Sequence, residues 1–141
     1  MALTSEAKTL WSGSLTDGSG STSLTSSGAA TLEVTWTGRS EGAAGVSNPE
    51  ELLGAAHSAC YSMALSNSLS KAGSPPESLD VTAAVTFIPG EGIAGSHLLV
   101  SAKVPGIDRE TFSSFAEDAK NSCPVSKALA GIQITLEATL Q

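Results

Sequence analysis

One long helix built from small and apolar residues most constrains what this chain can fold into. Residues 48–51 read Asn-Pro-Glu-Glu, which supplies an N-cap, a proline in the first turn and two carboxylates at the positive end of the helix dipole. The helix is expected to run to about Lys71, because Gly73 stops it and a proline pair follows. Glycine, alanine and serine occupy nearly every side, so other elements are expected to surround it.

Alternation of apolar and polar residues predicts strands on both sides of this helix. The expected strands are 9–15, 31–36, 79–88, 97–104 and 132–140, with a turn at 90–95 that makes a hairpin. Asp108 caps a further helix, which Pro124 interrupts before a short helix that extends to Ala130. The order predicts a single α+β domain over residues 1–141, with a mostly antiparallel sheet packed around the long central helix.

Composition and charge narrow the class of protein. The chain has 141 residues, the size of one ordinary domain, and a formal net charge of -7 with no basic patch, which argues against nucleic-acid binding. The long helix contains His57, Asn67 and several serines, so a buried helix is expected rather than a membrane span. The N-terminus lacks the charge and apolar run of a secretion signal, and a cytoplasmic, reducing environment is expected.

The two cysteines are the strongest candidates for chemistry. In a reducing compartment they are expected to be redox-active or inert rather than a structural disulfide. Cys60 lies about three turns inside the long helix, where it is either a buried structural thiol or one activated by a cation such as Arg39. Cys123 directly precedes Pro124 and a helix N-terminus, where thiol pKa values fall. Local chemistry alone therefore favours Cys123 as the nucleophile, although a small residue fitted to a kink is the alternative.

Other polar residues have a structural and a functional reading. Glu51 is expected to form a capping box with Asn48, which leaves Glu50 available for a functional ion pair. On spacing alone Arg39 reads as a surface salt-bridge residue. His57, three residues before Cys60, either tunes the thiol or simply packs. With His97 and the cysteines it lacks the close spacing of zinc ligands, so no metal is expected.

Several segments resemble the signatures of one family. Residues 48–60 read NPEELLGAAHSAC, residues 104–108 read VPGID, and residues 123–126 read CPVS. These motifs, with Trp-Ser-Gly at 11–13 and Arg39, closely resemble the OsmC family, the osmotically inducible branch of the OsmC/Ohr hydroperoxide reductases. The likeness covers nearly the whole chain. In the Ohr branch the arginine comes from the N-terminal loop, and residues 12–20 contain none, which places the chain in the OsmC branch.

This resemblance implies an intertwined homodimer with two active sites at the subunit interface. It implies that Cys60 is the peroxidatic cysteine and Cys123 the resolving one, while Arg39 and Glu50 hold the thiolate and the peroxide. The expected substrates are organic hydroperoxides, with hydrogen peroxide as a second candidate. No cofactor is expected, and an external thiol or dithiol would restore the reduced pair.

Two other readings stay open at the level of the sequence. The apolar helix could line a pocket for a small apolar ligand in a non-enzymatic binding protein. Alternatively, the two cysteines could form a permanent disulfide that staples the domain. A low-pKa thiol that peroxide consumes would favour the enzyme, whereas two inert thiols would favour the binding protein.

Overall fold

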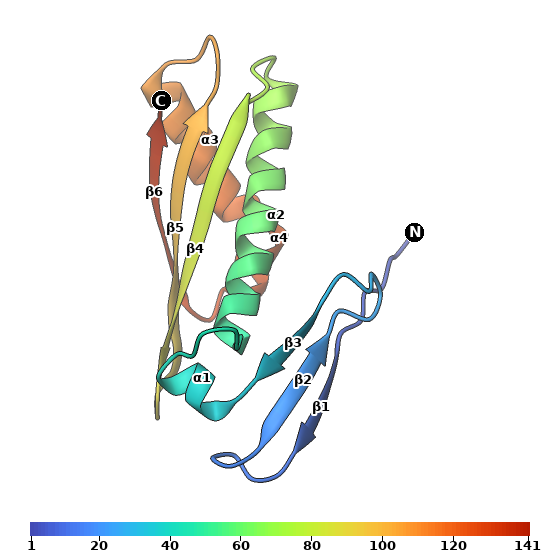
Figure 1. Cartoon of the computed structure of the whole chain (residues 1–141). Helices are drawn as coiled ribbons and strands as arrows, with labels where there is room; N and C mark the ends of the chain where they lie inside the picture. The colour runs from blue at the N-terminus through green and yellow to red at the C-terminus, as the bar shows by residue number, and fades with distance from the viewer. The chain divides into compact units, whose positions relative to one another are not determined.

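The computed structural model describes all 141 residues, which form two compact units, Met1–Leu52 and Leu53–Gln141. The chain forms six strands and four helices, so the predicted mixed α+β class is confirmed (Figure 1). Three of the four strand pairings are antiparallel, in agreement with the predicted, mostly antiparallel sheet. No helix is both long and apolar enough to cross a membrane.

The first unit contains a three-stranded antiparallel sheet in the order β1 (Lys8–Ser12), β2 (Ser19–Ser23) and β3 (Thr31–Val34). The sequence predicts the first and third strands but misses β2, which reads SGSTS and has no apolar residue to show a period. β2 forms because it is hydrogen-bonded to β1 on one side and to β3 on the other. A Cβ added at Gly20 would lie 2.8 Å from the Trp11 ring and 2.9 Å from a Val34 methyl group. Glycine therefore lets these side chains pack across β2.

A short helix, α1 (Trp36–Ser40), replaces the end of the strand predicted over residues 31–36. The Thr35 hydroxyl oxygen accepts a hydrogen bond from the backbone N–H of Gly38 at 2.9 Å, and the Ser40 hydroxyl donates to the Trp36 carbonyl at 2.9 Å. Threonine at an N-cap can thus start a helix where the alternating pattern suggests a strand. Arg39 therefore lies on helix α1 rather than in a loop after a strand.

The long helix is α2 (Pro49–Lys71), close to its predicted bounds. The side-chain oxygen of Asn48 accepts a hydrogen bond from the Glu51 N–H at 2.8 Å, which confirms the predicted cap. The Glu51 carboxylate instead accepts the Ser47 hydroxyl at 2.6 Å, so Ser47 completes the arrangement in place of the reciprocal capping-box bond. At the other end Gly73 adopts φ +83°, the left-handed conformation typical of helix stops.

The second unit holds a sheet in the order β4 (Ser78–Ile88), β5 (Gly92–Lys103) and β6 (Gln133–Leu140). The predicted hairpin of β4 and β5 is confirmed, although β5 begins earlier than the predicted His97, because residues 92–96 pair with β4. Strands β5 and β6 pair in parallel. A parallel pair needs a crossover, which α3 (Arg109–Ser122) and α4 (Pro124–Ala128) provide.

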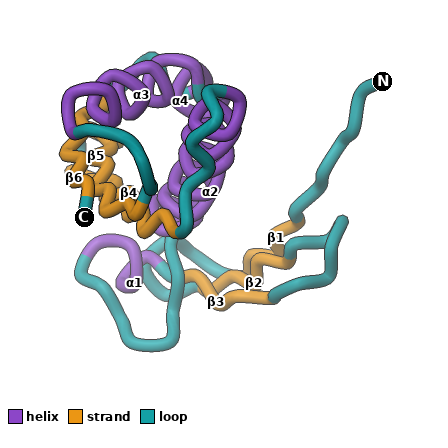
Figure 2. Tube along the Cα trace, turned by 90° about the horizontal axis from the view of Figure 1, so that it is seen from above, coloured by secondary structure: helices purple, strands orange, loops and turns teal.

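Helices α2 and α3 cover one face of this second sheet, as Figure 2 shows. The Asp108 carboxylate caps α3 by accepting the Thr111 N–H at 2.8 Å, as predicted, whereas α4 ends at Ala128 rather than Ala130. The covered face alternates with an exposed one along β4 and β6. The core between helices and sheet includes Tyr61, Leu65, Leu69, Leu98, Val100, Ala102, Phe112, Ala119 and Cys123.

A glycine in α2 allows the helix to approach β4. A Cβ added at Gly54 would lie 2.7 Å from the backbone oxygen of Ala83. We expect Gly54→Ala to lower the free energy of unfolding by about 1–2 kcal/mol, because the steric conflict outweighs the gain in helix propensity. Chemical denaturation measures the change. Gly131→Ala is the control, since no atom lies within 4 Å of its added Cβ. A Gly54→Ala protein as stable as the parent would contradict the prediction.

Candidate functional site

The structure brings the two cysteines together within the second unit. Cys60 lies in the middle of α2, and Cys123 lies between α3 and α4. Both thiols are free, and they lie near enough for hydrogen bonding between them to shift the pKa of each. Cys123 is 0% exposed, whereas Cys60 is only partly buried. Two thiols in contact can form a disulfide, and only one of them is open to a reactant.

The surroundings of Cys123 favour its ionised form. Burial opposes ionisation, but hydrogen bonding from the Ser126 N–H, the Cys60 thiol, the Ser126 hydroxyl and the Val125 N–H holds the pKa of Cys123 below its ordinary value. Val125 and Ser126 belong to the first turn of α4, which follows Cys123 directly. The helix-terminus argument made from the sequence therefore applies to this thiol.

The resting environment of Cys60 acts in the opposite direction. Burial raises the pKa of Cys60, and its hydrogen bond to Cys123 raises it further, while the Val125 N–H lowers it. The groups that shift the pKa of Cys60 include no cation, so an attack by Cys60 needs a positive charge from elsewhere or transfer of its proton to Cys123.

A buried histidine lies beside the cysteine pair. The Nδ1 atom of His57 is 2.7 Å from the Ser96 hydroxyl oxygen, and its Nε2 atom is 2.8 Å from the Ser126 hydroxyl oxygen. His57 is 0% exposed, and burial lowers its pKa, which keeps the ring neutral. The sequence offered tuning or packing for this residue, and the structure shows that both ring nitrogens are engaged.

Ser96 and Ser126 are polar residues that sequence reasoning did not single out. Ser96 lies within β5, where a serine facing inward among apolar residues could have been a signal. Ser126 follows Cys123 by three residues, the spacing that faces an N-cap residue in a helix. His97, by contrast, bonds Thr135 at 2.6 Å on the exposed face of the sheet, and no group of three or more His, Cys, Asp or Glu residues could hold a metal.

Arg39 and Glu50 form an ion pair within the first unit. Arg39 Nη2 is 2.8 Å from Glu50 Oε1, and Arg39 Nε is 3.1 and 3.3 Å from the two carboxylate oxygens. The side chains are 31% and 6% exposed, respectively. A partly buried, multiply bonded pair of this kind orients the guanidinium far more strictly than a surface salt bridge does. Structure thus brings together the two charged residues that the resemblance singled out.

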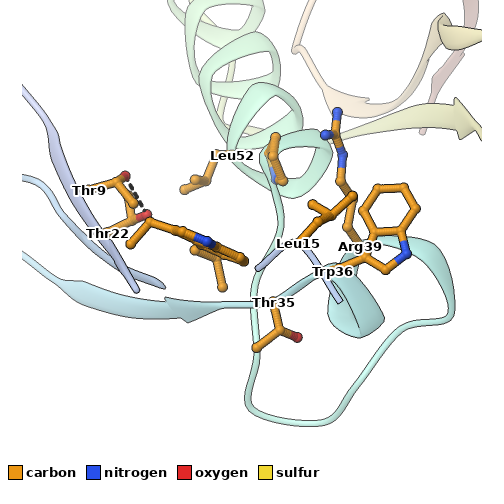
Figure 3. Close-up of a pocket in the computed structure, with 10 residues that line it drawn as sticks. Thr9, Leu15, Thr22, Thr35, Trp36, Arg39 and Leu52 are labelled. Atoms are coloured by element: carbon orange, nitrogen blue, oxygen red, sulfur yellow. Dashed lines mark hydrogen bonds between the residues drawn. The ribbon is translucent and has the colours of Figure 1, made fainter. Parts of the chain in front are cut away.

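An open, largely apolar cavity of about 370 Å³ adjoins this ion pair in the first unit. Figure 3 shows Trp36 and Arg39 of α1 at the cavity, with Leu52 and the hydrogen-bonded Thr9 and Thr22 around it. Its other lining residues are Trp11, Leu15, Val34, Thr35 and Pro49. The cavity offers apolar contacts and the charge of Arg39 to a small molecule.

Comparison with known proteins identifies relatives that match two thirds or more of the chain. The chain is 42% identical to peroxiredoxin OsmC of Escherichia coli over 134 residues, which are 93% of this chain and 92% of that protein. It is 32% identical to organic hydroperoxide resistance protein-like 2 of Staphylococcus epidermidis, over 67% of this chain and 68% of that protein.

The fold of this chain is also similar to solved structures of such proteins. An organic hydroperoxide resistance protein of Elizabethkingia anophelis is similar with a TM-score of 0.70 and 27% identity, over 100% of this chain and 97% of that one. The model of the family described as OsmC-like protein matches residues 27–137. The chain therefore belongs to the OsmC-like protein family.

Proposed function

We propose that this chain is a cysteine-based peroxidase that reduces organic hydroperoxides to alcohols, with hydrogen peroxide as a second substrate. Cys60 is the attacking thiol and Cys123 the resolving one. The observation that carries the proposal is the contact between a partly exposed and a fully buried free thiol. The relatives named peroxiredoxin and organic hydroperoxide resistance protein support the reaction class. No cofactor is needed, and a thiol or dithiol of the cytoplasm serves as reductant.

In the first step the Cys60 thiolate attacks one peroxide oxygen. A sulfur–oxygen bond forms, the oxygen–oxygen bond breaks, and the departing alkoxide takes a proton to leave as the alcohol. The peroxide is reduced by two electrons, and Cys60 becomes a sulfenic acid. In the second step the Cys123 sulfur displaces hydroxide from Cys60, which leaves as water and gives a disulfide. An external thiol pair then returns both cysteines to the reduced state.

The exposure of the two cysteines, rather than their pKa values, supports the assignment of Cys60 as the attacking thiol and Cys123 as the resolving one. The lower pKa of Cys123 would make it the better nucleophile, but its sulfur is fully buried. Cys60 is partly exposed, so a hydroperoxide can reach it, and a nearby cation would favour its thiolate. A resolving thiol needs to meet only its neighbouring sulfur, so complete burial suits Cys123. The reactive thiol in this proposal is therefore the one that a hydroperoxide can meet.

Replacing each cysteine by serine tests this assignment. We expect Cys60→Ser to abolish peroxide reduction, because the attacking sulfur is lost. Cys123→Ser should still consume one equivalent of peroxide and then gain further oxygen atoms on Cys60, because nothing resolves the sulfenic acid. Single-turnover kinetics and intact mass measure both outcomes.

The opposite pattern would reverse the roles. In that case Cys60→Ser would react with the first equivalent of peroxide and Cys123→Ser would be inert. If neither cysteine of the parent protein reacts with peroxide, the enzyme proposal fails. The apolar cavity beside Arg39 would then favour the alternative of a non-enzymatic protein that binds a small apolar ligand.

Arg39 and Glu50 are proposed to assist the first step. Cys60 needs a cation to favour its thiolate, and a guanidinium supplies charge without competing as a base. Glu50 holds that guanidinium through the ion pair described above. The apolar walls of the adjoining cavity suit the organic part of a hydroperoxide, while the guanidinium suits its polar oxygens.

We expect Arg39→Ala to raise the pKa of Cys60 by about one unit or more and to slow peroxide attack about tenfold, because an opposite charge is lost. Arg39→Lys should recover only part, since an ammonium lacks the paired planar donors. Glu50→Gln should slow the attack with less effect on the pKa. Alkylation of Cys60 across pH, beside single-turnover kinetics, measures both properties. Arg109→Ala, at the exposed start of α3, is the matched control. Unchanged profiles in Arg39→Ala would remove Arg39 from the mechanism.

The functional form is proposed to be a homodimer. Several large apolar side chains are exposed in the single chain, among them Met63 on α2 at 72% and Leu15 at 58%. A second copy that covers such side chains removes their apolar surface from water. We expect sedimentation equilibrium to give a dimer at micromolar concentration, and Met63→Glu to weaken it. A parent protein that stays monomeric and fully active at all concentrations would contradict the proposal.

A further inference from the structure

A continuous chain of buried hydrogen bonds crosses the second unit. Ser96 of β5 bonds to Nδ1 of His57 on α2, and Nε2 of His57 bonds to Ser126 of α4, at 2.7 and 2.8 Å. The three residues are 1%, 0% and 5% exposed. Three separate elements thus converge on one imidazole ring. Burying polar groups in this way is costly unless each finds its partners, and the ring finds both.

The neutral state of His57 fixes how hydrogens are shared along this chain. Burial lowers the pKa of His57, so the ring carries one N–H and one lone pair. In one tautomer the Ser96 hydroxyl donates to Nδ1, and the Nε2–H group donates to the Ser126 oxygen. The hydroxyl hydrogen of Ser126 is then directed away from the ring and is available to another acceptor.

The sulfur of Cys123 is placed to serve as that acceptor. Ser126 follows Cys123 by three residues in the first turn of α4, the position whose side chain and N–H face an N-cap residue. Hydrogen bonding from its N–H and its hydroxyl lowers the pKa of Cys123. In this arrangement each residue donates to the next, so Ser96 donates to His57, His57 to Ser126 and Ser126 to Cys123.

We propose that His57 and Ser126 are positioning residues for the resolving step, in which the buried hydrogen-bond chain aims a hydroxyl donor at Cys123 and keeps its sulfur ready to attack. This inference rests on the proposed function for the identity of the step. In that step the Cys123 sulfur bonds to the Cys60 sulfur, and the sulfur–oxygen bond of the sulfenic acid breaks. The hydroxide that leaves takes up a proton, equal to the one that Cys123 released on ionising, and departs as water.

Few other titratable groups surround Cys123. From α2 it meets Cys60 and Tyr61, whose hydroxyl donates to the Ala116 carbonyl at 2.9 Å. Burial raises the pKa of Tyr61, which keeps that side chain neutral. On α3, Glu117 pairs with Lys120 at 2.8 Å, and on α4 Lys127 is exposed. The inward side chains of the sheet are Ser96 and apolar residues. With Cys60 replaced, a thiolate titration therefore reports Cys123.

The test compares Ser126→Val with Ser126→Thr, two side chains of the same shape that differ in the hydroxyl. Both are made in a Cys60→Ala background, and the ultraviolet absorbance of the thiolate is followed across pH. We expect the valine variant to move the pKa of Cys123 upward by about one unit, the effect of one lost charge-assisted hydrogen bond, and threonine to remain near serine. This reading needs no peroxidase activity and no access of reagent to the buried sulfur.

The same substitutions in the chain with both cysteines test the chemical step. After one equivalent of organic hydroperoxide, Ser126→Val should oxidise Cys60 at the parent rate and form the disulfide about tenfold more slowly, with more over-oxidation. His57→Leu should behave like Ser126→Val. His57→Gln should recover part, because its amide can still donate toward Ser126. His97→Leu is the matched control, as His97 bonds only Thr135 on the exposed face.

The outcomes separate this inference from the proposed function. Equal pKa values for Cys123 in the valine and threonine variants, with equal rates of disulfide formation, would overturn it and leave the buried bonds a purely structural role. A shift confined to the valine variant would support it, even in a protein that proved inert to peroxide. In that case the proposed peroxidase function would fail, while the role of Ser126 in the ionisation of Cys123 would stand.

Discussion

The buried imidazole of His57 is the constraint on which the geometry of the cysteine pair depends. It lies one helical turn before Cys60 and bonds a serine three residues after Cys123, so one ring fixes the separation between α2 and α4. Its other nitrogen anchors both to β5 through Ser96. An unpaired polar atom at this depth would cost about 1–3 kcal/mol. That penalty disfavours any sliding of α2 that would part the two sulfurs.

The same arrangement explains how two neighbouring thiols differ. Both lie in a largely apolar core, and burial acts against ionisation of each. Cys123 directly precedes a helix, and both Val125 and Ser126 of its first turn lower the pKa of this thiol, whereas Cys60 lies in mid-helix and only the Val125 N–H acts on it in this way. The difference therefore arises from backbone position rather than from amino-acid type. Solvent exposure differs in the opposite direction, because Cys60 is partly exposed and Cys123 is fully buried.

The sequence predicts what local rules govern. Caps at Asn48 and Asp108, the helix stop at Gly73 and the alternating strands all follow from short-range chemistry, and they are confirmed. Strand β2 and helix α1 were not predicted, and each has a physical reason. The first has no apolar period and forms through its two neighbours, and the second depends on a single threonine cap. The parallel pairing of β5 with β6 is likewise set by the crossover between them rather than by either strand alone.

The site shows the same division between local and long-range causes. The motif around Cys123 predicts a helix N-terminus, so the sequence alone indicates a lowered pKa for this thiol. The hydrogen-bond partners of His57, by contrast, lie 39 and 69 positions away in the sequence. No local rule could supply them. The ion pair of Arg39 and Glu50 is similar, because it required a helix that the alternating pattern concealed. The family resemblance thus singled out the two cysteines, but the network of polar residues beside them depends on the assembled sheet. Serines within apolar segments are consequently the residues in which such networks are most easily overlooked, since serine is common and unremarkable until its partner is known.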